Sequence, residues 1–250
     1  MLRLAVILPA YNEAARIEKA VRSAGRFVGS LGFPAEVIVV DDGSRDGTVA
    51  IVERAIAEMP QVRLIRHDRN RGKGMAVRTG LLAAGSEWAL FSDVDEAVPI
   101  GEAVRLLEAG EAEQADVVIG TRYHRHSRIL RRQPWQRILV SRLGNLLIRA
   151  LLLPGLRDTQ CGFKLFRTAS TRSVFERITV RGFGFDVEVL AIARAFGCRI
   201  LEVPVTWIHG EGSTLRLAPA AVDVFRDLLR ITWRVRTGCY AKHPGPDPRE

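Results

Sequence analysis

Two aspartates one residue apart, Asp93 and Asp95, are the residues of this sequence best suited to chemistry. They follow an apolar run, residues 88–91, typical of a buried strand. Side chains two residues apart share one face of a strand, so both carboxylates can point into the same space where the strand ends. Such oxygen ligands suit Mg²⁺ or Mn²⁺, and the metal could hold a diphosphate leaving group. A polar exit from a strand into a loop would look the same, so the pair alone leaves both interpretations open.

Two further apolar runs, residues 4–8 and 36–40, also end in acidic segments. The first is followed by Tyr11 and Glu13, and the second by Asp41. Strand-like runs alternate with helical patterns through the first half of the chain, which predicts an α/β fold with a mainly parallel sheet flanked by helices. Ligands of such sheets bind beyond the carboxyl ends of the strands. We therefore expect the three acidic strand ends to converge on one crevice.

The bulk composition is that of one large domain, or of one domain with an appendage. The 250 residues include 47% hydrophobic and 26% charged residues and carry a net charge of +9. This excess favours anionic partners such as phosphorylated substrates, acidic lipid headgroups or nucleic acid. Few aromatic residues accompany the arginines and no nucleic-acid-binding module is present, so we expect no nucleic-acid partner. The three cysteines are far apart, which indicates neither a zinc site nor a disulfide framework and suggests a reducing compartment.

Several other classes are disfavoured by missing motifs. The sequence has no P-loop and no glycine-rich dinucleotide motif after the first strand, which disfavours ordinary kinases, NTPases and dehydrogenases. It also has no pattern of a signal peptide and no apolar run long enough to span a membrane. We therefore expect a cytoplasmic protein. The sequence does not indicate an oligomeric state.

Two arginine-rich segments stand out in the second half. Residues 124–137 are basic and short of apolar residues, which predicts a mobile loop, and residues 135–153 have a helical pattern. A last helix, residues 219–236, combines an apolar stripe with Arg226, Arg230 and Arg234 at four-residue spacing. A basic amphipathic helix of this kind can lie in a membrane surface. An ordinary helix that packs on the sheet and exposes its arginines is the alternative.

The order of the motifs resembles the inverting glycosyltransferases of family 2, which have the GT-A fold. The resemblance covers residues 2–215 and is closest to the polyprenyl-phosphate (dolichyl-phosphate) β-glucosyl- and mannosyltransferases. It is carried by Leu8-Pro9-Ala10-Tyr11-Asn12-Glu13, Asp41-Asp42-Gly43-Ser44, Asn70-Arg71-Gly72-Lys73-Gly74, Asp93-Val94-Asp95 and Asp158-Thr159-Gln160-Cys161-Gly162-Phe163-Lys164.

The resemblance implies a role for individual residues at the donor site. Asp93 and Asp95 would bind Mg²⁺ or Mn²⁺ and the donor diphosphate. We expect Asp95 to be a catalytic residue as well. The mannosyl branch often has a glutamine two residues after the second aspartate, and Ala97 at that position disfavours GDP-mannose relative to UDP-glucose. The residues expected to bind the rest of the nucleotide sugar are Pro9, Tyr11, Glu13, Asp41 and Lys73.

At the acceptor site the resemblance implies a phosphate cradle made of Arg122, Arg137 and Ser141. The guanidinium fork fits phosphate oxygens, although a solvated basic face would also explain the two arginines. Asp158 is a candidate catalytic residue, either as a general base or by orienting the acceptor. It is equally compatible with a structural loop carboxylate.

We accordingly expect a metal-dependent transfer of a hexose, glucose before mannose, from a nucleotide sugar to a polyprenyl phosphate at the membrane surface. The alternative is a soluble family 2 enzyme with a small-molecule or polysaccharide acceptor. The predicted organisation is a catalytic domain at residues 1–215, a basic amphipathic helix at 216–238 and a disordered tail at 239–250.

Overall fold

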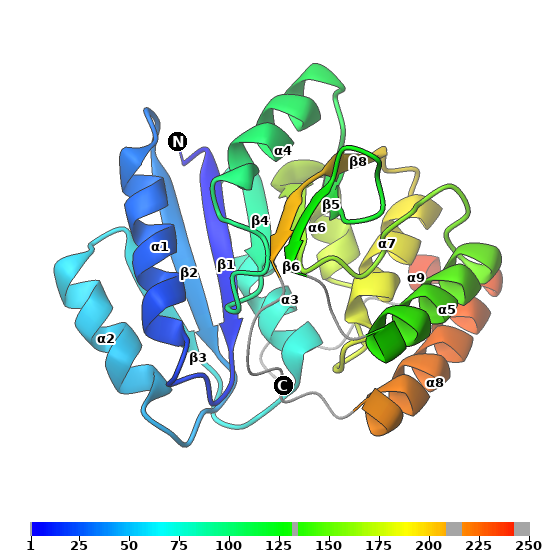
Figure 1. The fold of residues 1–250 in the computed structure, drawn as a ribbon, viewed down its shortest axis with the longest axis horizontal. Coiled ribbons are helices and arrows are strands. Elements are labelled where there is room, and N and C mark those ends of the chain that lie inside the picture. The colour runs from blue at the N-terminus through cyan, green and yellow to red at the C-terminus, as the bar shows by residue number, and fades with distance from the viewer. Residues whose placement is uncertain (1, 132–134, 209–216, 243–250) are drawn as a thin grey trace.

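A seven-stranded sheet forms the centre of the computed structural model, which describes residues 2–131, 135–208 and 217–242 (Figure 1). Within these ranges the side chains of residues 131, 135–141, 217–224 and 242 are not described. The strand order is β3-β2-β1-β4-β7-β5-β8, and only β7 runs antiparallel to its neighbours. The strands are β1 (Leu4–Ala10), β2 (Ala35–Asp41), β3 (Val62–Arg66), β4 (Trp88–Ser92), β5 (Val117–Thr121), β7 (Phe163–Arg167) and β8 (Ile200–Pro204).

Helices cover both faces of this sheet (Figure 1). One core lies beneath α1 (Ile17–Ser30), α2 (Thr48–Glu58) and α4 (Glu102–Ala112). The other core is closed by α3 (Lys73–Ala83), α5 (Trp135–Leu151), α6 (Thr168–Phe175), α7 (Phe185–Ala195), α8 (Leu217–Arg236) and α9 (Cys239–Lys242). Because each face is covered, strands such as β1 and β4 are buried throughout their length, which explains their continuous apolar sequences.

The predicted α/β architecture with a mainly parallel sheet is confirmed, and two local predictions need correction. Part of the expected mobile loop at residues 124–137 forms strand β6 (Arg128–Arg131), which pairs with β9 (Thr206–Ile208). The expected tail from residue 239 begins with α9, in which Tyr240 is buried. In both segments the contacts that create the order come from residues far away in the sequence. Residues 243–250 lie outside the described part of the chain.

Figure 1 shows α5 and α8 side by side at one end of the molecule. Within the described ranges, none of the helices is both long enough and apolar enough to cross a bilayer. The carboxyl ends of β1, β2 and β4 lie at one edge of the sheet, where β1 pairs in parallel with both other strands. This edge carries the candidate site.

Candidate active site at the carboxyl edge of the sheet

The acidic strand ends meet at this edge, as the sequence predicts. Asp93 and Asp95 follow β4, and Glu13 follows the neighbouring β1. Burial raises the pKa of Glu13, and Asp95 and Asp93 add to the rise against the opposing effect of Arg16. Burial, and then Asp93, likewise raise the pKa of Asp95. These carboxylates therefore experience one another's charge, which concentrates negative potential at the end of β4.

Lys73 supplies a positive charge to this acidic group. Its Nζ lies 2.6 Å from Asp93 Oδ1 and 5.4 Å from the centre of the Phe91 ring. Burial opposes the charged form of Lys73, but Asp93 and then Asp186 outweigh that effect and raise its pKa. The lysine therefore stays protonated beside the two aspartates. A fixed cation at this position suits an anionic ligand.

A buried ion pair lies near the partly exposed pair of Lys73 and Asp93, and no role is predicted for either of its residues from the sequence. Lys164 on β7 contacts Asp186 on α7, and its Nζ also donates to the Cys161 carbonyl oxygen at 2.5 Å. Burial raises the pKa of Asp186, while Lys164 and Lys73 oppose the rise. Positive and negative groups thus alternate from Asp93 through Lys73 and Asp186 to Lys164. Neighbours in this row are 20 to 113 positions apart in the chain, so local patterns could not reveal it.

Gly162 fixes the position of Asp93 from the other side. The Asp93 amide donates to the Gly162 carbonyl oxygen at 3.1 Å. A Cβ atom built on Gly162 would lie 2.0 Å from Asp93 Oδ2, so only glycine leaves space for this carboxylate. Gly162 lies in the motif that precedes β7, and the antiparallel direction of β7 brings that motif to the carboxyl end of β4.

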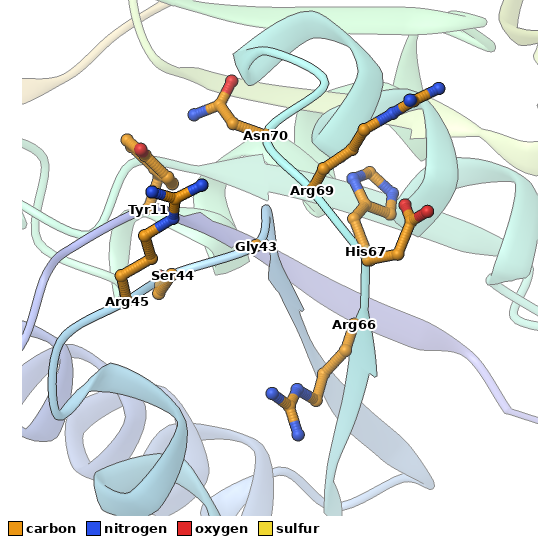
Figure 2. A pocket seen from close by; sticks show the side chains of 9 residues that line it. Tyr11, Gly43, Ser44, Arg45, Arg66, His67, Arg69 and Asn70 are labelled. Atoms are coloured by element: carbon orange, nitrogen blue, oxygen red, sulfur yellow. The ribbon is translucent and has the colours of Figure 1, made fainter.

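A pocket of about 450 Å³ opens at the same edge of the sheet (Figure 2). It lies between the ends of β1, β2 and β3, and Figure 2 shows Arg45, Arg66 and Arg69 around it. Its other lining residues are Tyr11, Gly43, Ser44, His67, Asp68 and Asn70. A polar pocket lined by three arginines, at the sheet edge that also carries Asp93 and Asp95, is suited to a nucleoside diphosphate.

Asp41 is the last residue of β2 and is fully buried. The Ser44 amide donates to its Oδ2 at 3.2 Å, whereas Oδ1 has no hydrogen-bond partner among the described residues. A buried carboxylate oxygen without a donor is costly, and a hydroxyl or N–H group of a ligand would offset the cost. Pro9, the other predicted donor residue on this side, is buried within β1. Their predicted roles in donor binding remain predictions.

Asp42, the neighbour of Asp41, has a different task. Its Oδ1 lies 2.7 Å from His67 Nδ1 and accepts from the Arg71 amide at 2.9 Å, and its Oδ2 accepts from the Gly72 amide at 2.8 Å. Gly43, with φ of +73°, lets the chain turn so closely that an added Cβ would lie 2.5 Å from the Arg69 carbonyl carbon. Asp42 therefore holds the loop after β3, which forms one wall of the pocket.

Arg122 and Asp158, predicted to act at the acceptor, are bound to each other. The Arg122 backbone amide and Nε donate to Asp158 Oδ2 at 2.9 and 2.7 Å, and its Nη2 donates to Oδ1 at 2.8 Å. Burial opposes the charge of Asp158, but Arg122 outweighs it and lowers the pKa of Asp158. The side chains of Arg137 and Ser141 lie outside the described residues. The acceptor roles of all four stay predictions.

The carboxylates at the end of β4 fit a divalent metal that also binds a substrate. Within the ranges that the structure describes, no three acidic, histidine or cysteine side chains are close enough to hold a metal without other ligands. Mg²⁺ typically takes one or two carboxylates and completes its coordination with phosphates and water. Asp93 and Asp95 are two such carboxylates, and a diphosphate in the adjacent pocket would supply further oxygens.

Comparisons with known proteins agree with this fold. Residues 5–175 match the sequence profile described as glycosyl transferase family 2. The dolichyl-phosphate beta-glucosyltransferase of Dictyostelium discoideum is 32% identical over 248 residues, 95% of this chain and 76% of that protein. The Homo sapiens protein of the same name is 34% identical over 251 residues, 95% of this chain and 77% of that protein.

A solved structure shares the architecture. Glucosyl-3-phosphoglycerate synthase from Mycobacterium tuberculosis, in complex with Mn²⁺, UDP-glucose and phosphoglyceric acid, matches with a TM-score of 0.68 at 20% identity. The match covers 93% of this chain and 80% of that chain. The fold is thus the α/β fold of the GT-A type, as the motif order predicts. The chain belongs to glycosyl transferase family 2 and is a glycosyltransferase.

Proposed function

We propose that this protein transfers glucose from UDP-glucose to a polyprenyl or dolichyl phosphate, with inversion at the anomeric carbon. The observation that carries the proposal is the similarity to two dolichyl-phosphate β-glucosyltransferases over 95% of the chain. Ala97, in place of the glutamine expected in a mannosyl enzyme, supports glucose over mannose. GDP-mannose is the second donor to test.

On the donor side, we assign the nucleoside to the pocket at the ends of β1, β2 and β3 and the diphosphate to Asp93, Asp95 and Lys73. Asp41 Oδ1 would accept a hydrogen bond from the ribose or base. A bound Mg²⁺ or Mn²⁺ would neutralise the diphosphate and stabilise the leaving nucleoside diphosphate. Lys73 holds a proton and a positive charge against Asp93 and therefore draws the same phosphates toward the carboxylates.

On the acceptor side, a phosphate monoester is anionic at neutral pH and needs orientation more than a strong base. Asp158 has a lowered pKa and its carboxylate oxygens are both bound by Arg122, so it is a poor proton acceptor. Of its two possible roles, this arrangement favours orientation over base catalysis. We infer that Asp158 holds Arg122, whose side chain is partly exposed, toward the acceptor phosphate.

We further propose that α5 and α8 seat the enzyme on an anionic membrane surface. The two helices lie side by side and expose apolar side chains beside arginines. Leu146 and Leu147 on α5 and Phe225, Leu229 and Trp233 on α8 are each about half exposed. Several large exposed apolar side chains on two neighbouring helices are typical of an interaction surface. Basic residues add attraction to anionic headgroups. In this scheme residues 1–215 form the catalytic domain and residues 216–238 the lipid-facing helix.

A donor screen tests the proposal. UDP-glucose, UDP-GlcNAc, UDP-galactose and GDP-mannose are each incubated with Mg²⁺ or Mn²⁺, with and without a short polyprenyl phosphate, and release of nucleoside diphosphate is measured. We expect release from UDP-glucose only when the lipid is present. Release from another donor would refute the sugar assignment. Turnover that a small soluble acceptor supports and the lipid does not would establish the alternative acceptor class.

A further inference from the structure

The loop between α6 and α7 packs closely against Gly72 and Gly74, the two glycines that flank Lys73. The Gly74 amide donates to the Arg181 carbonyl oxygen at 2.8 Å. A Cβ on Gly74 would lie 2.2 Å from the Val180 carbonyl oxygen, and one on Gly72 would lie 2.4 Å from the Arg181 carbonyl oxygen. Gly72 also has φ of +98°, which disfavours other residues. The backbone at residues 180 and 181 therefore determines where Lys73 begins α3.

Glu188 on α7 holds this loop. Its side chain is fully buried, and its Oε2 accepts from the backbone amides of Thr179 and Val180 at 2.8 and 2.7 Å. Its Oε1 accepts from Thr179 Oγ1 at 2.7 Å. A buried carboxylate that accepts two amides and a hydroxyl is well satisfied and restricts the loop to one position.

The C-terminal helices complete the same cluster. The Tyr240 hydroxyl on α9 donates to Glu188 Oε1 at 2.8 Å, and burial together with Glu188 raises the pKa of Tyr240. Arg234 on α8 donates to Thr179 Oγ1, and its Nη1 lies 3.9 Å from Glu188 Oε1. The helix with an apolar outer face thus reaches, on its inner face, the loop that supports Lys73.

We propose that Glu188 is a positioning residue for the donor site, and that α8 and α9 act on donor affinity through it. The inference rests on the proposed function, since it takes Lys73 to be a donor-binding residue. Glu188, Thr179, Arg234 and Tyr240 all lie beyond residue 175, where the match to the family profile ends. The path runs from Tyr240 and Arg234 to Glu188, from Glu188 to the loop backbone, and from Arg181 to the Gly74 amide.

Tyr240→Phe tests this path because it removes one hydroxyl and keeps the ring in the core. Thr237→Val is the matched control, since among the described residues the Thr237 hydroxyl, just after α8, bonds only to the local carbonyl oxygens of Trp233 and Arg234. Affinity for UDP with Mn²⁺ is measured by calorimetry, and the KM values for UDP-glucose and for polyprenyl phosphate are measured separately. Should the wild type bind GDP instead of UDP, GDP and its sugar are used.

We expect Tyr240→Phe to weaken nucleoside diphosphate binding and to raise the donor KM about five-fold, the factor that corresponds to ~1 kcal/mol. The KM for polyprenyl phosphate stays at the wild-type value, and Thr237→Val changes none of these quantities. If Tyr240→Phe does not fold, the same measurements are made on Thr179→Val, which removes the hydroxyl between Glu188 and Arg234. Wild-type nucleotide affinity and donor KM in a folded variant, even with a lowered melting temperature, would overturn the inference.

The binding measurement also keeps the two proposals apart. Nucleoside diphosphate binding needs no acceptor, so it reports on Glu188 even if the lipid is not the acceptor. A wild type that binds UDP but transfers nothing to polyprenyl phosphate refutes the proposed function and leaves this inference standing. If the wild type transfers glucose to polyprenyl phosphate and Tyr240→Phe binds UDP as tightly as the wild type, the proposed function stands and this inference is refuted.

Discussion

Gly162→Ala should disable the donor site while the protein stays folded. The added Cβ would lie 2.0 Å from Asp93 Oδ2 and 2.6 Å from its Cγ. Ordinary contact begins at 3.4 Å, so the carboxylate has to move by about 1.4 Å. Gly162 is not among the glycines with positive φ, so the backbone itself accepts alanine. A shift of about 1 Å in a catalytic group costs about 100-fold in rate, and we expect a loss of this size in UDP release.

The assay needs three readouts and one control. Turnover is measured as UDP release, Mn²⁺ affinity in the presence of UDP by calorimetry, and stability by thermal unfolding. We expect turnover and Mn²⁺ affinity to fall together, with a melting temperature within about 4 °C of the wild type. Gly101→Ala is the control, because a Cβ on Gly101 meets no atom within 4 Å. A folded Gly162→Ala protein with turnover within two-fold of the wild type would refute the placement of Asp93 in the site.

Three further predictions address the metal, the buried pair and the surface. Asp95→Asn should abolish metal-dependent donor turnover and leave the circular dichroism spectrum unchanged; normal activity would remove Asp95 from the metal site. Arg122→Met leaves the buried Asp158 carboxylate without its cation, which should cost about 3–5 kcal/mol in urea unfolding. Because the pKa of Asp158 is lowered in the folded protein, its stabilising effect is present above the ordinary aspartate pKa of about 3.9 and is lost as the pH falls through the lower value. Arg122→Met should therefore raise the pH at which the protein unfolds in acid. An unchanged midpoint of acid unfolding would contradict this. Reversal of Arg226 and Arg230 to Glu should reduce sedimentation with anionic vesicles, whereas unchanged sedimentation would return α8 to an ordinary packed helix.

The parallel half of the sheet could be predicted because its signals are local. The runs at residues 4–8, 37–40 and 88–91 are apolar throughout, since these parts of β1, β2 and β4 are buried on both faces. Acidic residues directly after such runs have to lie at the carboxyl edge, whatever the rest of the fold. This reasoning located the ends of β1, β2 and β4, and with them the acidic part of the site.

The antiparallel strand β7 was not predicted, for a physical reason. Its sequence places Lys164 among apolar residues, and the charge is tolerated only because Asp186 on α7 pairs with it. A local sequence pattern cannot reveal that Lys164 pairs with Asp186, which lies 22 residues further along the chain. The pairing of Asp42 with His67 escaped notice for the same reason, although both residues are next to predicted strands.

The arginines of the last helix show how a spacing rule loses accuracy over distance. Four residues advance a helix by about 40° beyond a full turn, so Arg226, Arg230 and Arg234 do not share one line along it. Arg226 and Arg230 are exposed, whereas Arg234 turns inward to Thr179 and Glu188. Arg234 is for this reason left intact in the charge reversal. Arg234 differs from the other two arginines because it faces the buried carboxylate of Glu188, which lies on α7 and not in the last helix.

Direct detection of the product tests the transfer of glucose to a lipid phosphate most sharply. The enzyme is incubated with Mn²⁺, UDP-glucose labelled in the sugar and a short polyprenyl phosphate, and the label is followed into organic solvent. We expect a glucosyl phospholipid with the β configuration, formed by the wild type and absent with Asp95→Asn. Label that stays in the aqueous phase, or that reaches the lipid equally well with the Asp95→Asn enzyme, would contradict the account.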